Sequence, residues 1–170
     1  MNSAPSPAPP GRVASLHLHP AASGAPLQSV DCIEVLVDQG IRGNPRHFDR
    51  TSSSGGPSRR QVSLIEREQI AEHAATLGLQ TIAPGVVRSN IETTGINLIE
   101  LVGRHVEIGE ALLHFYEPRR PCHQMEAIHP GLQALMKDNR QGVLATVVRS
   151  GRIRVGDTLQ LLHGPAGAKM

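Results

Sequence analysis

The chain has 170 residues, a length typical of one domain with or without a short arm. Its 17 basic residues nearly balance 15 acids, and with one Tyr, two Phe and no Trp it lacks the charge excess and stacking side chains of a nucleic-acid-binding protein. No apolar stretch is long enough to span a bilayer and no secretion signal precedes the domain, so we expect a soluble cytoplasmic protein that contacts neither nucleic acid nor membrane.

The N-terminal segment changes character after residue 10. Residues 1–10 contain four prolines and few large side chains, a composition that predicts a disordered arm. Alternating apolar and polar residues over 14–19 then predict a half-buried strand, with His17 and His19 facing solvent. A second strand is predicted over 30–37.

Residues 42–60 carry the densest positive charge in the chain. Their Ser-, Gly- and Pro-rich composition predicts a long mobile loop, and such loops inside compact domains are commonly functional. The loop has one acid, Asp49, against five arginines, which are Arg42, Arg46, Arg50, Arg59 and Arg60.

Two helices are predicted beyond this loop. The clearer one covers residues 63–78, where Ser63 and Glu66 form a capping-box pattern and Gly78 provides a C-terminal stop. A shorter helix is predicted after Pro130. The buried face of the longer helix consists of apolar residues three or four apart, Ile70, Ala74 and Leu77.

The remaining sequence is rich in short strands separated by glycine turns. This pattern predicts a mostly β, α+β domain that resembles a barrel and carries one or two helices. The predicted strands cover residues 86–91, 104–108, 111–116, 143–149 and 158–162.

The candidate reactive residue is Cys122, in the sequence Arg-Arg-Pro-Cys-His at residues 119–123. A cation directed at the sulfur favours the thiolate, which is both a nucleophile and a soft metal ligand. The alternative is a buried cysteine that acts as a small hydrophobic residue. Cys32, in an apolar run beside two acids, is predicted to be of that kind.

A second polar cluster contains Arg88, Ser89, Asn90 and Thr93 around Gly95. Guanidinium, amide and hydroxyl groups together can hold a polar ligand, although the same residue types are common in ordinary turns. The nine histidines form no recognisable zinc-binding motif.

Six segments, taken in order, match a known pattern: residues 11–20, 40–48, 61–66, 88–103, Pro121-Cys122 and 151–157. Together they resemble the MOSC domain, the module found at the C-terminus of molybdenum-cofactor sulfurases and as small stand-alone bacterial proteins. The resemblance implies one domain over residues 11–163, with 164–170 as a C-terminal tail. It also implies a closed, strand-rich β-barrel with a few peripheral helices, in which residues 61–66 form the strand that enters a helix.

The resemblance implies binding of molybdenum–molybdopterin, with Cys122 as the metal ligand and catalytic thiolate, and reduction of N-hydroxylated or similar small substrates. It implies a separate electron donor and no pyridoxal phosphate. A second interpretation is a sulfur carrier in which Cys122 holds a persulfide supplied by a cysteine desulfurase, and a third is a non-catalytic binding module. The residues expected to hold the cofactor are Arg88, Asn90, Thr93 and Arg120, with Arg46, Arg59 and Arg60 from the basic loop.

The sequence differs from the family pattern in three respects. Asn44 stands where the family has an aspartate, and Pro45 is inserted after it. Ser89 replaces the second arginine of the Arg-Arg-Asn segment. The N-terminal β-barrel domain of amidoxime-reducing relatives has no counterpart in this sequence, so another subunit would have to supply that half of the cofactor envelope.

Overall fold

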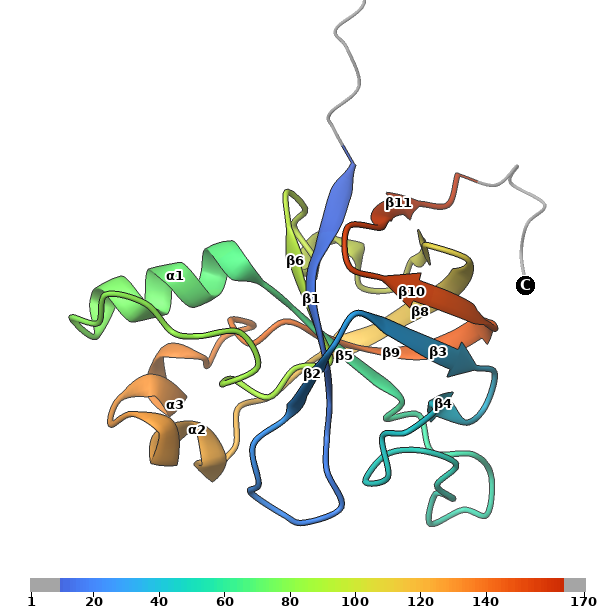
Figure 1. Ribbon diagram of the computed structural model, residues 1–170, viewed down its shortest axis with the longest axis horizontal. Coiled ribbons are helices and arrows are strands. Elements are labelled where there is room, and N and C mark those ends of the chain that lie inside the picture. The colour runs from blue at the N-terminus through green and yellow to red at the C-terminus, as the bar shows by residue number, and fades with distance from the viewer. Residues whose placement is uncertain (1–9, 164–170) are drawn as a thin grey trace, which may run out of the picture.

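A computed structural model describes residues 10–163 (Figure 1). The tail predicted over 164–170 and residues 1–9 of the predicted arm lie outside the described residues. Seven strands form a closed barrel in the order β11-β7-β8-β9-β5-β6-β1, and β2 pairs with β1 beside this ring. The bounds are β1 Gly11–Leu18, β2 Gln28–Val30, β5 Val62–Glu66, β6 Ile91–Thr94, β7 His105–Ile108, β8 Ala111–Pro118, β9 Val143–Arg149 and β11 Thr158–Leu161. The predicted mostly β barrel is therefore confirmed.

A small antiparallel sheet, β10-β3-β4, lies on one side of the barrel (Figure 1). Its strands are β3 Cys32–Leu36, β4 Gly40–Ile41 and β10 Gly151–Arg154. Ile33 and Val35 point inward and are buried, so the alternation of the strand places Cys32 on the outer face. The prediction of a core cysteine is wrong, because Cys32 is exposed.

Three short helices lie on the opposite side of the barrel (Figure 1). They are α1 Arg67–Thr76, α2 His123–Ile128 and α3 Leu132–Leu135, and a 3₁₀ turn covers Ile99–Leu101. Helix α1 connects β5 to β6, the one parallel pair of the described barrel, which requires such a crossover. The helices bury a second core, separate from the barrel interior, made of Ile65, Ile70, Ala74, Ile82, Val87, Met125, Leu132 and Met136.

The predicted helix over 63–78 starts later than expected. Residues 62–66 form β5, as the family resemblance implied, and the helix begins at Arg67 with Glu66 as an N-cap whose side chain makes no capping bond. The capping-box prediction is wrong because Ser63 is buried in the barrel wall and bonds to Asn90 instead. The predicted stop is confirmed, since Gly78 has φ 74° and ends the helix.

Two other predictions from alternation also fail. Residues 86–90 are not extended, because Gly85 and Arg88 have positive φ values of 84° and 66°, and the strand begins only at Ile91. His17 and His19 do not face solvent: they are 1% and 5% exposed. A register shift in β1 between residues 13 and 15 interrupts the simple alternation there.

Candidate functional site

Cys122 lies between strand β8 and helix α2. The main-chain N–H of Arg119 donates to the carbonyl of Gly142 at 2.9 Å, and that of Met125 donates to the carbonyl of Cys122 at 3.0 Å. Met125 is fully buried in the second core and anchors α2. The half-buried Cys122 side chain makes no capping bond and no disulfide with Cys32. Its backbone is therefore fixed on both sides, and the residue is partly exposed.

Arg119 is a buried cation close to this thiol. It is 6% exposed, and its Nη1 donates to the carbonyl oxygen of Arg88 and to Oγ of Ser89, both at 3.0 Å. Burial, followed by the charge of Arg60, lowers the pKa of Arg119 to about 10, whereas Cys122 acts in the opposite direction. Two neutral oxygens do not compensate a buried charge, so the geometry favours an anion at this position.

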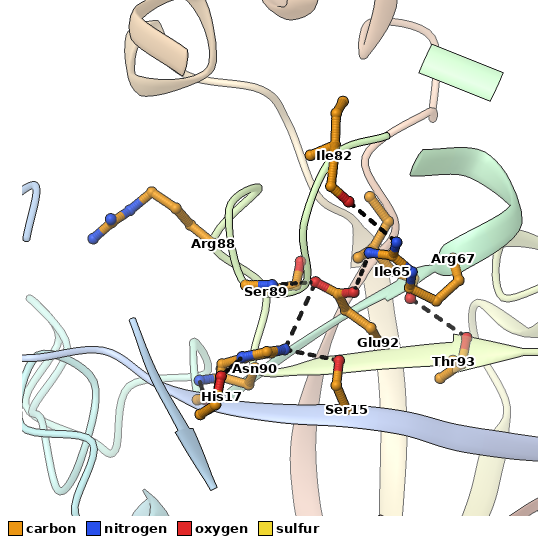
Figure 2. A network of polar contacts seen from close by, with 12 residues as sticks. Ser15, His17, Ile65, Arg67, Ile82, Arg88, Ser89, Asn90, Glu92 and Thr93 are labelled. Atoms are coloured by element: carbon orange, nitrogen blue, oxygen red, sulfur yellow. Dashed lines mark hydrogen bonds and ion pairs between the residues drawn. The ribbon is translucent and has the colours of Figure 1, made fainter. Parts of the chain in front are cut away.

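Arg88 approaches Cys122 from the segment before β6. It is 7% exposed, and its Nη1 donates to the carbonyl of Ala25 at 2.8 Å. Figure 2 shows its side chain pointing away from Glu92. Burial and then Arg46 lower the pKa of Arg88, and Cys122 again opposes them. Cys122 therefore lies close enough to both buried arginines to raise their pKa values against the effect of burial.

Four arginines from separate segments share this region, and we call Arg46, Arg60, Arg88 and Arg119 the arginine cluster. They come from the 42–60 loop, the segment before β6 and the end of β8. Over residues 10–163, none of the four forms an ion pair with a carboxylate. Five arginines elsewhere do, namely Arg42, Arg67, Arg140, Arg149 and Arg154. The cluster thus concentrates positive charge that the described protein does not neutralise.

Asn90 organises the polar wall beneath the cluster. It is 2% exposed, and its Oδ1 accepts from the N–H and the hydroxyl of Ser63, both at 3.1 Å. Its Nδ2 donates to the carbonyl of His17 at 3.0 Å and makes a longer contact of 3.4 Å with Oδ1 of Asn44. Because the whole amide is engaged, Asn90 holds β1, β5 and the basic loop together.

The other predicted site residues lie apart from this arrangement. Arg120 is exposed, on the opposite side of the chain from buried Arg119. The guanidinium of Arg59 stacks over the ring of Tyr116, 4.1 Å from its centroid. Thr93 is buried in β6, where its hydroxyl donates to the carbonyl of Ile65 at 3.5 Å.

A second buried polar network lies beside the site and is self-contained (Figure 2). Glu92 is fully buried and accepts from Nη1 of Arg67 and from the N–H of Gly85, each at 2.7 Å. The ring of His17 lies 3.7 Å from the same carboxylate. Burial lowers the pKa of His17, so this ring is neutral at pH 7. All the charge here is compensated, unlike that of the arginine cluster.

Sequence reasoning missed Arg119, His19, His47 and Asn44. A β-bulge between Phe115 and Glu117 changes the phase of side chains at the end of β8, and no sequence pattern marks it. His19 and His47 lie in contact, with ring centroids 5.2 Å apart, although 28 residues separate them in the chain. Only the resemblance drew attention to Asn44, as a departure from the family pattern.

The donor set fits an anionic, thiol-ligated metal cofactor better than a free metal ion. Within the described part of the chain, no three His, Cys, Asp or Glu side chains are placed to hold a metal. A single cysteine sulfur on a partly exposed residue suits a soft metal that brings its other ligands with it. The unpaired guanidinium groups suit the phosphate of such a cofactor. None of the helices over residues 10–163 has the length and hydrophobicity needed to cross a membrane.

Comparison with known proteins agrees with this architecture. Residues 41–160 match the family model of the MOSC domain. The fold is similar to that of YuaD from Bacillus subtilis, with a TM-score of 0.76 at 22% identity, covering 89% of this chain and 94% of the other. It is also similar to YiiM from Geobacillus stearothermophilus (TM-score 0.70, 18% identity, 94% and 78% covered) and YiiM from Escherichia coli (0.64, 20%, 91% and 71%). No curated protein matches the sequence.

The closed barrel of seven strands gives the class of the protein, a strand-rich β-barrel domain. The family match spans well over half of the chain, and the protein belongs to the MOSC domain family, which is generally linked to binding of the molybdenum cofactor.

Proposed function

We propose that this protein binds the molybdenum cofactor and supports reduction of N-hydroxylated or similar small substrates. The observation that carries the proposal is the buried guanidinium of Arg119, which has no carboxylate partner over residues 10–163 and lies near the reachable thiol of Cys122. A buried cation without a counter-charge is stabilised when a phosphate or another anion binds.

Each element of the site has a separate part in this proposal. Cys122 supplies the thiolate that ligates the metal, and Arg119 and Arg88 bind anionic oxygens beside it. Arg46 and Arg60, from the basic loop, add charge at the more exposed side. When bound, the molybdenum centre supplies two-electron redox chemistry. A separate redox protein would deliver the electrons.

Metal and pterin analysis tests this proposal directly. Protein purified from a cofactor-competent host should contain stoichiometric molybdenum and pterin, and C122S should lose the metal. Arg119→Met should lose both, whereas Cys32→Ser, on the outer face of β3, should retain both and is the matched control. Wild-type protein without molybdenum and pterin, or C122S with full occupancy, would contradict the proposal.

The partial exposure of Cys122 also favours a second candidate, a sulfur carrier. The Cys122 thiolate would attack the outer sulfur of a persulfide on a cysteine desulfurase, forming Cys122–S–S⁻ and releasing the donor thiolate. Metal-free protein with cyanide-labile sulfur that disappears in C122S would support this function. If cofactor and labile sulfur are both absent, the result supports the third interpretation, a non-catalytic binding module.

A further inference from the structure

Two histidines lie next to the arginine cluster and have no role in the proposed function. His19 follows β1 and His47 lies in the basic loop, and their rings meet edge to face at 5.2 Å. They line a cavity of about 10 Å³, shared with Arg60, Ser63 and Asn90, which is the size of one water or one ligand oxygen. The pair therefore borders the same charged region as the thiol.

Asn44, which is hydrogen-bonded to the main chain of both histidines, has an unpartnered side-chain nitrogen. Asn44 is fully buried, and its Oδ1 accepts from the main-chain N–H of His19 at 2.6 Å. Its Nδ2 has no hydrogen-bond partner among the described residues. Buried polar groups in proteins are nearly always satisfied, so an unpartnered donor beside the His pair indicates a ligand or water oxygen.

The charges that face the two rings are all positive. Burial lowers the pKa of His19 to about 3, and the groups that lower it further are His47, Arg119, Arg88 and Arg60. Burial lowers the pKa of His47 to about 4, and Arg60, Arg46, Arg119 and Arg50 add to this effect. No carboxylate among the described residues appears in either set, so both rings are neutral at pH 7.

We propose that His19, His47 and Asn44 form a proton-accepting subsite of the anion site, so that a phosphate-type oxyanion binds to the arginine cluster together with a proton on the His pair. The inference rests on the proposed anion site and concerns its dependence on pH. A dianion placed among the guanidinium groups cancels the field that keeps the imidazoles neutral. A protonated ring and the Asn44 amide then both donate hydrogen bonds to the ligand.

The coupling between proton binding and anion binding determines how the affinity for the anion changes with pH. The free rings bind protons only near pH 3 and 4, and the anion moves protonation toward the ordinary value of about 6.5. Affinity should therefore rise as pH falls below about 6.5, by up to tenfold per pH unit for each ring that takes up a proton. Above that pH the contribution of the two rings to the dependence should disappear.

Titration calorimetry with inorganic pyrophosphate tests the inference. At pH 6, measured in two buffers of different ionisation enthalpy, wild-type protein should take up about one proton more per bound pyrophosphate than a variant without the His pair, because protons exchanged by pyrophosphate itself are common to both. His47→Gln and His19→Gln should reduce that uptake. Circular dichroism spectra and thermal melts report whether each variant is folded. His163→Gln, exposed beyond β11, is the matched control and should leave the uptake unchanged.

The outcomes separate this inference from the proposed function. Pyrophosphate binding with the same proton exchange in wild type and in both His variants overturns the inference while leaving the anion site in place. No pyrophosphate binding by wild-type protein overturns the inference together with the anion site on which it rests. Cofactor occupancy, measured by metal and pterin analysis, is decided independently. Ring signals of His47 in NMR spectra, titrated with and without pyrophosphate, give a second readout that does not depend on any variant.

Discussion

Replacing Arg119 with methionine should stabilise the ligand-free protein, although Arg119 is buried and hydrogen-bonded. A tenfold change in a protonation equilibrium is worth about 1.4 kcal/mol, so lowering the pKa of this guanidinium to about 10 costs the cation ~3 kcal/mol. Arg119→Met removes that cost and loses two hydrogen bonds, each worth about 1 kcal/mol. The net gain of about 1 kcal/mol should raise Tm by roughly 2–4 °C.

The same substitution at Arg67 provides the matched control with the opposite sign. Arg67 pairs with fully buried Glu92 at 2.7 Å, so Arg67→Met leaves an uncompensated carboxylate and should cost about 3–5 kcal/mol. Differential scanning calorimetry of both variants, with and without pyrophosphate, measures the contrast. Pyrophosphate should raise Tm of the wild type but not of Arg119→Met. If Arg119→Met loses as much stability as Arg67→Met, and pyrophosphate leaves wild-type Tm unchanged, the buried guanidinium has a structural role and the reasoning is refuted.

Two further predictions concern acid stability and backbone geometry. His19 and His47 protonate near pH 6.5 in the unfolded chain but only near 3 and 4 when folded, so stability should be complete above pH 6.5 and fall as pH drops toward 4. Urea denaturation at pH 7 and pH 5 measures this, and a His47→Gln variant with an unchanged pH dependence would contradict it. Gly142 has φ 77° and its missing Cβ faces the backbone of β5, so Gly142→Ala should cost at least about 3 kcal/mol. Gly56→Ala, where a Cβ meets open space, should stay within about 1 kcal/mol of wild type in the same experiment.

Much of the fold could be predicted because periodicity reports burial directly. The predicted strand over 143–149 coincides with β9, and the glycine stop at Gly78 is where α1 ends. The errors occur where tertiary contacts override local pattern. Ser63 matches a capping motif in the sequence, but in the structure its hydroxyl bonds to Asn90, which lies 27 residues away in the chain. Likewise, the sequence predicts a strand over residues 86–91, but the positive φ of Arg88 interrupts the extended backbone there and β6 begins only at Ile91.

The candidate site was only partly predictable, for a different reason. Cys122, Arg88 and Arg60 were found because local charge and a family pattern mark them. Arg119 and Arg120 are adjacent arginines that sequence cannot distinguish, and the end of β8 buries one and exposes the other. Their difference depends on the register of the strand, which changes at a bulge.

The two buried polar clusters, one around Glu92 and one around Arg119, differ in whether their charges have partners within the protein. Glu92, Arg67 and Gly85 form a closed set in which every charge has a partner, and such a set adds specificity to the fold without a ligand. Arg119 and Arg88 of the arginine cluster are buried more deeply than Arg67, yet neither has a carboxylate partner within the described residues. A protein able to compensate one buried guanidinium could compensate another. Under the proposed function a ligand supplies the counter-charge that is missing near Cys122, and the stability contrast between Arg119→Met and Arg67→Met tests that proposal.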